Sequence, residues 1–105
     1  MSDLVRQRMV IHGRVQGVFF RESTRQVAEA AGVAGWVRNL HDGIVETVVE
    51  GRADAVAQVV AFCRAGPPDA RIDRIEVFDE PAEGLPGFAI RLTPPREWPA
   101  GPAGR

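Results

Sequence analysis

The sequence predicts an α+β domain in which two helices cover one face of an antiparallel sheet. Short runs of alternating apolar and polar residues are typical of half-buried strands, whereas residues 22–31 and 53–65 repeat their apolar residues at helical spacing. Asp42-Gly43 lies between two of the extended runs and is a strong hairpin signal. The order strand, helix, strand, strand, helix, strand is that of the ferredoxin-like split βαββαβ sandwich, which is the fold we expect.

The first strand is expected at Arg8–His12, with Met9 and Ile11 on the face that meets the core. The period then changes, and Glu22–Ala31 is expected to form the first helix. Gly32 is placed to end that helix, because glycine readily adopts the left-handed conformation that follows many helices.

The second and third strands are expected at Val33–Leu40 and Ile44–Glu50, and the odd-numbered residues of the latter share one face. Because the glycine of Asp42-Gly43 accepts the positive φ of a tight turn, these two strands should be antiparallel neighbours.

The second helix is expected at Ala53–Ala65, where valines and Cys63 form an apolar stripe. It should end at Gly66-Pro67-Pro68, because two prolines cannot continue a helix. Ile72–Asp79 and Phe88–Leu92 supply further extended runs.

Length and composition indicate one small domain with a single core, since the chain has 105 residues and is 45% hydrophobic. We assign residues 1–92 to that domain and residues 93–105 to a Pro/Gly-rich tail with little to bury, in which Trp98 could dock locally. The 13 basic residues are all arginine and are balanced by 14 acidic residues, which gives no general reason to expect a nucleic acid or a membrane as partner.

The single Cys63 excludes an intramolecular disulfide and indicates a reducing compartment. No apolar stretch has the length of a signal peptide core or of a membrane span. We therefore expect a cytoplasmic protein.

The most informative stretch is the loop between the first strand and the first helix, residues 13–21, which reads GRVQGVFFR. Gly13 and Gly17 can adopt positive φ angles, so the intervening N–H groups can point into one concavity and bind an anion. The helix that follows adds unpaired N–H groups, and Arg21 adds a charge that matches phosphate bidentately. Neither nucleotide-binding glycine motif is present, and two glycines at this position could also serve the turn alone.

The loop resembles the signature of the acylphosphatases, and GWVRN at residues 35–39, followed by Asp42-Gly43 and Gly51, resembles that family's second signature. The likeness extends from about Met9 to Leu92. Acylphosphatases hydrolyse the mixed anhydride of a carboxylate and phosphate. The resemblance therefore implies a hydrolase that acts on a small acyl phosphate and releases inorganic phosphate, which should also inhibit it.

The resemblance also implies the roles of individual residues. Arg21 corresponds to the phosphate-binding and catalytic cation, and Asn39 to the residue that orients the attacking water. Backbone N–H groups of the loop would hold the phosphoryl oxygens, so that the expected substrate-binding residues are Val15, Gln16, Gly17, Val18, Phe19, Phe20 and Arg21. Gln16 is interpreted as a residue that shapes the loop, or as a solvated side chain.

The expected topology brings the two catalytic candidates together. In a split βαβ unit the first and second strands are parallel and the third lies between them, so Arg21 and Asn39 should face each other across roughly 10 Å. Asn39 cannot act as a base, so the proton of the water should pass to a phosphoryl oxygen of the substrate. Positioning and charge stabilisation can carry this reaction.

Other reactive side chains are expected to be structural. His12 and His41 lack metal-ligand spacing, and Cys63 should pack as a small hydrophobic residue. Ser23 and Thr24 fall where hydroxyl groups commonly cap helices. We expect no metal and no cofactor.

Two alternative functions share features with this sequence. An RNA-binding sheet would need exposed aromatic residues among basic ones on its open face. The open faces of the central strands are instead expected to carry Val10, His12, Val48, Glu46 and Glu50. Trp36, Phe19 and Phe20 are expected in the core or in a pocket wall. A carbamoyl-phosphate-handling domain of a larger maturation factor is closer, but the chain length favours a free-standing enzyme, expected to be a monomer.

Overall fold

The computed structural model describes residues 4–96, so Trp98 and most of the expected tail lie outside the described residues. The strands are β1 Leu4–Arg14, β2 Ala34–Asn39, β3 Val45–Arg52, β4 Arg71–Glu80 and β5 Phe88–Ile90, and the helices are α1 Phe20–Ala31 and α2 Ala53–Ala65. A short 3-10 turn, η1 His41–Gly43, joins β2 to β3. Each predicted helix and strand is present, with ends shifted by a few residues.

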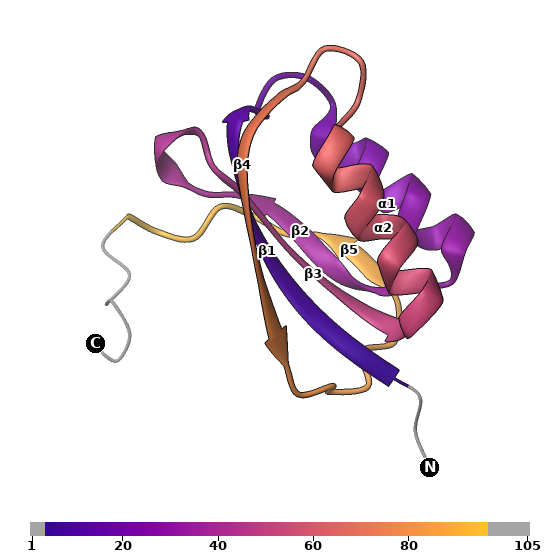
Figure 1. Ribbon diagram of the computed structural model, residues 1–105. Helices are drawn as coiled ribbons and strands as arrows, with labels where there is room; N and C mark the ends of the chain where they lie inside the picture. The colour runs from indigo at the N-terminus through magenta and orange to yellow at the C-terminus, as the bar shows by residue number, and fades with distance from the viewer. Residues whose placement is uncertain (1–3, 97–105) are drawn as a thin grey trace.

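Both helices pack on the same face of a twisted five-stranded sheet (Figure 1), which confirms the predicted ferredoxin-like fold. The strand order is β4-β1-β3-β2-β5, with antiparallel pairing except between β2 and β5. The sheet is therefore mixed and not wholly antiparallel as predicted. The chain reverses direction after β4 but crosses to the far edge of the sheet, so that β5 is antiparallel to β4 and parallel to β2.

The β2–β3 hairpin forms at the predicted place. Asp42 and Gly43 have φ angles of 67° and 80°, and the Leu40 N–H donates to the Ile44 carbonyl at 2.7 Å. This hairpin fixes the end of β2, where Asn39 is the last residue.

The core lies between the helices and the sheet. Its members are the predicted apolar positions of the strands together with the inner faces of both helices, including Met9, Ile11, Val45, Val49, Ala28, Val56, Val59 and Cys63. Burial raises the pKa of the Cys63 thiol to about 12, so this residue packs as a hydrophobic group and is not a nucleophile. Leu92 differs from the prediction, because β5 ends at Ile90 and the Leu92 side chain is 90% exposed.

The open face of the sheet carries a network of ion pairs. Arg6 and Arg8 share the Glu80 carboxylate at 3.0 Å each, and Arg38 pairs with Glu46 at 2.8 Å. The Glu50 carboxylate forms a further ion pair with Arg6, at 3.6 Å. The arginine charges of this network are thus balanced by glutamates.

Two aromatic residues also lie on this face, contrary to expectation. The guanidinium groups of Arg38 and Arg91 each lie 4.8 Å from the Trp36 ring, which leaves Trp36 only 8% exposed. Phe78 lies under Arg8 at 4.6 Å. Trp36 is therefore covered by cations instead of being open for base stacking.

Glu50 holds the segment that crosses from β4 to β5. Its carboxylate accepts hydrogen bonds from the N–H groups of Glu83, Gly84 and Leu85 at 2.7, 2.7 and 2.9 Å, although the residue is only 3% exposed. Burial opposes ionisation, but the three donors and Arg6 outweigh it and hold the pKa of the carboxyl below its usual value.

No helix among residues 4–96 combines the length and the apolar character needed to cross a membrane.

Candidate active site

The loop between β1 and α1 spans residues 15–19, and its two predicted glycines have different roles. Gly17 has a φ of 75° with open space around it, as expected for the turn of an anion-binding loop. Gly13 lies within β1, where a Cβ atom would come within 2.1 Å of the Arg71 carbonyl oxygen. Its small size therefore allows the contact between β1 and β4, where the pairing register shifts.

Helix α1 begins without a side-chain cap. Phe19 precedes it in the left-handed conformation with a φ of 64°, and the Ser23 N–H makes the first bond, to the Phe19 carbonyl, at 3.0 Å. Thr24 donates instead to the Phe20 carbonyl at 2.8 Å, so neither predicted hydroxyl caps the helix. The first-turn N–H groups consequently keep their bonding capacity for a ligand.

The backbone N–H groups of the loop are also free to bind a ligand. Within residues 4–96, no backbone N–H from Val15 to Phe19 donates to a backbone or side-chain acceptor. Unpaired donors at a helix N-terminus are the usual setting for binding an anion.

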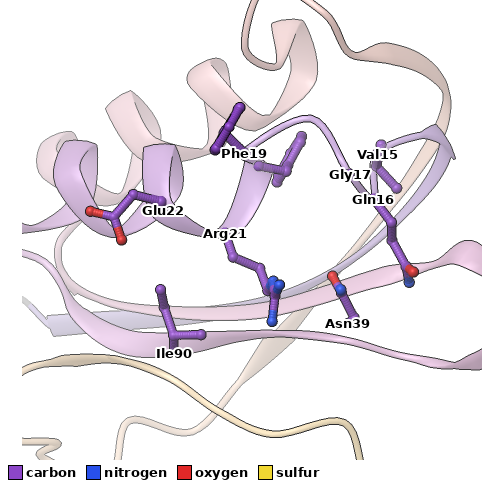
Figure 2. Close-up of a pocket in the computed structure, with 9 residues that line it drawn as sticks. Val15, Gln16, Gly17, Phe19, Arg21, Glu22, Asn39 and Ile90 are labelled. Atoms are coloured by element: carbon purple, nitrogen blue, oxygen red, sulfur yellow. The ribbon is translucent and has the colours of Figure 1, made fainter.

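A pocket of about 450 Å³ opens beside this loop. Figure 2 shows the Arg21 side chain extending from α1 into the pocket toward Asn39 at the end of β2. The nine residues that line it are Val15, Gln16, Gly17, Phe19, Phe20, Arg21, Glu22, Asn39 and Ile90. The structure thus brings both predicted catalytic residues into one cavity.

Two groups in the pocket lack the partners that buried or charged groups usually have. The Asn39 Oδ1 atom is buried and has no hydrogen-bond partner in the part of the chain that the structure describes. Arg21 makes no ion pair or hydrogen bond through its side chain with any residue in the described range 4–96. The carboxylate of the neighbouring Glu22 accepts hydrogen bonds from Arg25 and Gln26 instead. The Arg25 hydrogen bond is the main cause that lowers the pKa of Glu22 below its usual value, although burial partly opposes it.

Gln16 connects the loop to the hairpin. Its side-chain Nε2 donates to the carbonyl oxygens of Leu40 and Ile44 at 2.9 Å each. These carbonyls flank the turn that follows Asn39, so Gln16 ties the phosphate-loop candidate to the strand end that carries the second catalytic candidate. The interpretation of Gln16 as a loop-shaping residue agrees with this geometry.

The side chains of the remaining loop residues divide between core and surface. Val15, Val18 and Phe20 are buried, and Val18 does not line the pocket, so its backbone is the part available to a ligand. Phe19 is 80% exposed at the pocket wall.

The two histidines lie elsewhere. His12 pairs with Glu76 at 2.9 Å on the open face of the sheet, and His41 bonds to the Pro94 carbonyl at 2.8 Å. Among residues 4–96, no group of three or more His, Cys, Asp or Glu side chains is arranged to hold a metal ion.

Sequence reasoning missed Glu22 and Ile90 as pocket residues. The alternation of the closing strand identifies Ile90 only as part of an extended run, whereas the parallel pairing sets it against Val37 at the sheet edge, where it is 40% exposed. Only the β2–β5 pairing, which the pattern did not reveal, could have identified it.

The chain is similar to known acylphosphatases in sequence. A protein-family model described as Acylphosphatase matches residues 7–90. The acylphosphatase of Rubrobacter xylanophilus is 58% identical over 87 residues, which cover 82% of this chain and 79% of that protein.

Solved structures of acylphosphatases also resemble this chain. An acylphosphatase from Coxiella burnetii superposes with a TM-score of 0.81 at 35% identity, covering 85% of this chain and 94% of that one. Full-length HypF in a phosphate- and nucleotide-bound form matches with a TM-score of 0.78 at 26% identity, over 86% of this chain and 12% of HypF.

Proposed function

The chain belongs to the acylphosphatase family and is a hydrolase of acyl phosphates, and from that premise we propose how its residues divide the work. Arg21 and the N–H groups of residues 15–20 bind the phosphoryl group, and Asn39 positions the water. One observation carries this division: the same pocket holds the Arg21 guanidinium, which has no counter-ion among the described residues, and the buried Asn39 amide oxygen, which accepts from no donor among them.

The phosphoryl group is held by charge and by hydrogen bonds together. The guanidinium of Arg21 presents two parallel donors to two phosphoryl oxygens, a geometry that lysine lacks. The loop N–H groups contact the remaining oxygens, and these interactions strengthen as charge develops in the transition state.

Asn39 supplies the acceptor that the attacking water needs. Its Oδ1 atom accepts a hydrogen bond from the water, and the water's lone pair then faces phosphorus. The new bond joins the water oxygen to phosphorus, while the bond from phosphorus to the acyl oxygen breaks and the carboxylate departs. The water's proton passes to a phosphoryl oxygen, so the products are a carboxylate and inorganic phosphate.

The test compares the release of phosphate from acetyl phosphate with its release from a phosphate monoester such as p-nitrophenyl phosphate. We expect turnover of the acyl phosphate alone, with competitive inhibition by inorganic phosphate. Arg21→Gln should weaken phosphate inhibition and lower kcat together, and Arg21→Lys should recover little of either. Equal activity on both substrates, or an Arg21→Gln variant that binds phosphate as tightly as the parent, would contradict the proposed roles.

We also propose that the enzyme is a cytoplasmic monomer without metal, nucleic-acid or membrane partners, and that residues 1–92 are its functional domain. The balanced composition and the closed ion-pair network on the open face support this proposal. Sedimentation of the purified chain at several concentrations tests the oligomeric state.

A further inference from the structure

We propose that the pocket selects acyl phosphates whose acyl group is uncharged and apolar, and that Ile90 and Glu22 make this selection. The inference rests on the proposed function, because it uses the direction of attack that Asn39 imposes. It concerns the end of the pocket that the phosphoryl-binding groups leave free.

The sheet register fixes where that end lies. Ile90 on β5 pairs with Val37 on β2, and Asn39 lies two residues after Val37 on the same strand. Ile90 and Asn39 are therefore separated by two residues along the strands and by one strand spacing across them, which is roughly 8 Å. Figure 2 shows the Arg21 guanidinium between Asn39 on one side and Ile90 on the other. Glu22 lies on the same side of Arg21 as Ile90.

The direction of attack then places the acyl group. In phosphoryl transfer the entering and leaving oxygens are roughly in line with phosphorus. A water held by Asn39 therefore directs the departing carboxylate away from Asn39, toward Ile90 and Glu22.

The apolar part of this end is available for contact. Ile90 is 40% exposed, and Phe19, which lines the same pocket, is 80% exposed. An apolar acyl group covering such surface removes it from water, and that gain grows with the contact area. A phenyl group should therefore be favoured over a methyl group.

The charged part of this end disfavours anions. Glu22 is ionised at neutral pH, since Arg25 lowers its pKa, but Arg25 also bonds to Glu29 at 2.8 Å. Two carboxylates thus share one guanidinium, and the group keeps one net negative charge at the pocket rim. A second carboxylate on the substrate would be repelled by it.

The experiment measures kcat/KM for benzoyl, acetyl and succinyl phosphates, which carry a phenyl, a methyl and a carboxylate-bearing chain respectively. The parent enzyme should prefer them in that order. Ile90→Thr, which keeps the β-branch of the strand residue, should reduce the benzoyl-to-acetyl ratio about 5-fold. Glu22→Gln should raise the succinyl-to-acetyl ratio about 3-fold, and this gain should shrink at high ionic strength.

Two matched variants serve as controls. Leu92→Thr makes the same kind of change at a residue that is 90% exposed and does not line this pocket. Glu29→Gln removes the other carboxylate bonded to Arg25, also outside this pocket. Both substrate ratios should stay at the parent value in Leu92→Thr, and Glu29→Gln should change the succinyl ratio less than Glu22→Gln does.

The outcomes separate this inference from the proposed function. If acetyl phosphate is hydrolysed but the parent treats the three substrates alike, or if the controls shift the ratios as much as the pocket variants, the acyl-end assignment is wrong while the function stands. If none of the three substrates is hydrolysed, the function and this inference both fail.

Discussion

Replacing Asn39 with alanine should remove catalysis without removing stability. Within residues 4–96, no protein group donates a hydrogen bond to the buried Asn39 Oδ1 atom, so alanine at this position removes no protein hydrogen bond to that atom. Alanine loses some packing but no such bond, so the free energy of unfolding should change by less than about 1 kcal/mol. In contrast, kcat should fall by about 10²-fold, or about 2.7 kcal/mol of transition-state stabilisation.

The assay combines steady-state hydrolysis of acetyl phosphate, inhibition by inorganic phosphate and urea denaturation of the same preparations. Phosphate should still inhibit Asn39→Ala nearly as in the parent, because Arg21 and the loop N–H groups remain. Arg21→Gln is the matched control, in which inhibition and kcat decline together. A near-parental kcat for Asn39→Ala would refute the water-positioning role, and a loss of more than about 2 kcal/mol in unfolding free energy would show that Asn39 is structural.

Four further predictions concern the rest of the chain. Gln16→Ala removes two 2.9 Å hydrogen bonds and should lower kcat for acetyl phosphate about 10-fold, an effect that Gln16→Glu, which cannot donate, should reproduce. Glu50→Gln should lower the unfolding free energy by about 2 kcal/mol at neutral pH. Because folding depresses the Glu50 pKa, this stabilisation is present above about pH 4.5 and is lost as the pH falls. In urea titrations the loss of stability at acid pH should therefore be smaller in the variant than in the parent, and the decline that remains comes from other carboxyls with lowered pKa values, such as Glu76 and Glu80. Chelators should leave turnover unchanged, and restoration of activity by a divalent ion would contradict this. A chain ending at Thr93 loses the His41 bonds to Pro94 and Arg96 and should unfold with less than about 2 kcal/mol of lost stability.

Local patterns were sufficient for most of the fold. The alternation around Met9 and Ile11 and the turn residues Asp42-Gly43 each identified an element that the structure contains, because these signals arise within a few residues. The parallel pairing of β5 with β2 was not predictable in this way. It depends on a crossing held by the Glu50 carboxylate, a contact between residues more than 30 positions apart.

The pocket shows the same division between local and long-range information. Residues 13–21 and 35–39 could be recognised as two signatures, and the expected topology brought Arg21 toward Asn39. The pattern did not reveal the left-handed conformation of Phe19, since bulky residues rarely adopt a positive φ. Nor did it show that Gln16 reaches across to Leu40 and Ile44, because a glutamine in a loop is usually solvated.

The contrast between the ion-pair network on the open face of the sheet and the groups in the pocket supports the proposal that the pocket is the active site. On the open face Arg6 has one buried nitrogen without a hydrogen bond, yet that nitrogen lies 3.6 Å from the Glu50 carboxylate, so its charge is compensated. In the pocket, Arg21 has no counter-ion within the described residues, the Asn39 Oδ1 atom has no donor, and Phe19 adopts a backbone conformation that costs about 1 kcal/mol or more. A phosphoryl group and its water would relieve the first two of these costs directly. The proposed active site thus holds groups that a substrate could satisfy, whereas the arginines of the open face are paired with glutamates of the same face.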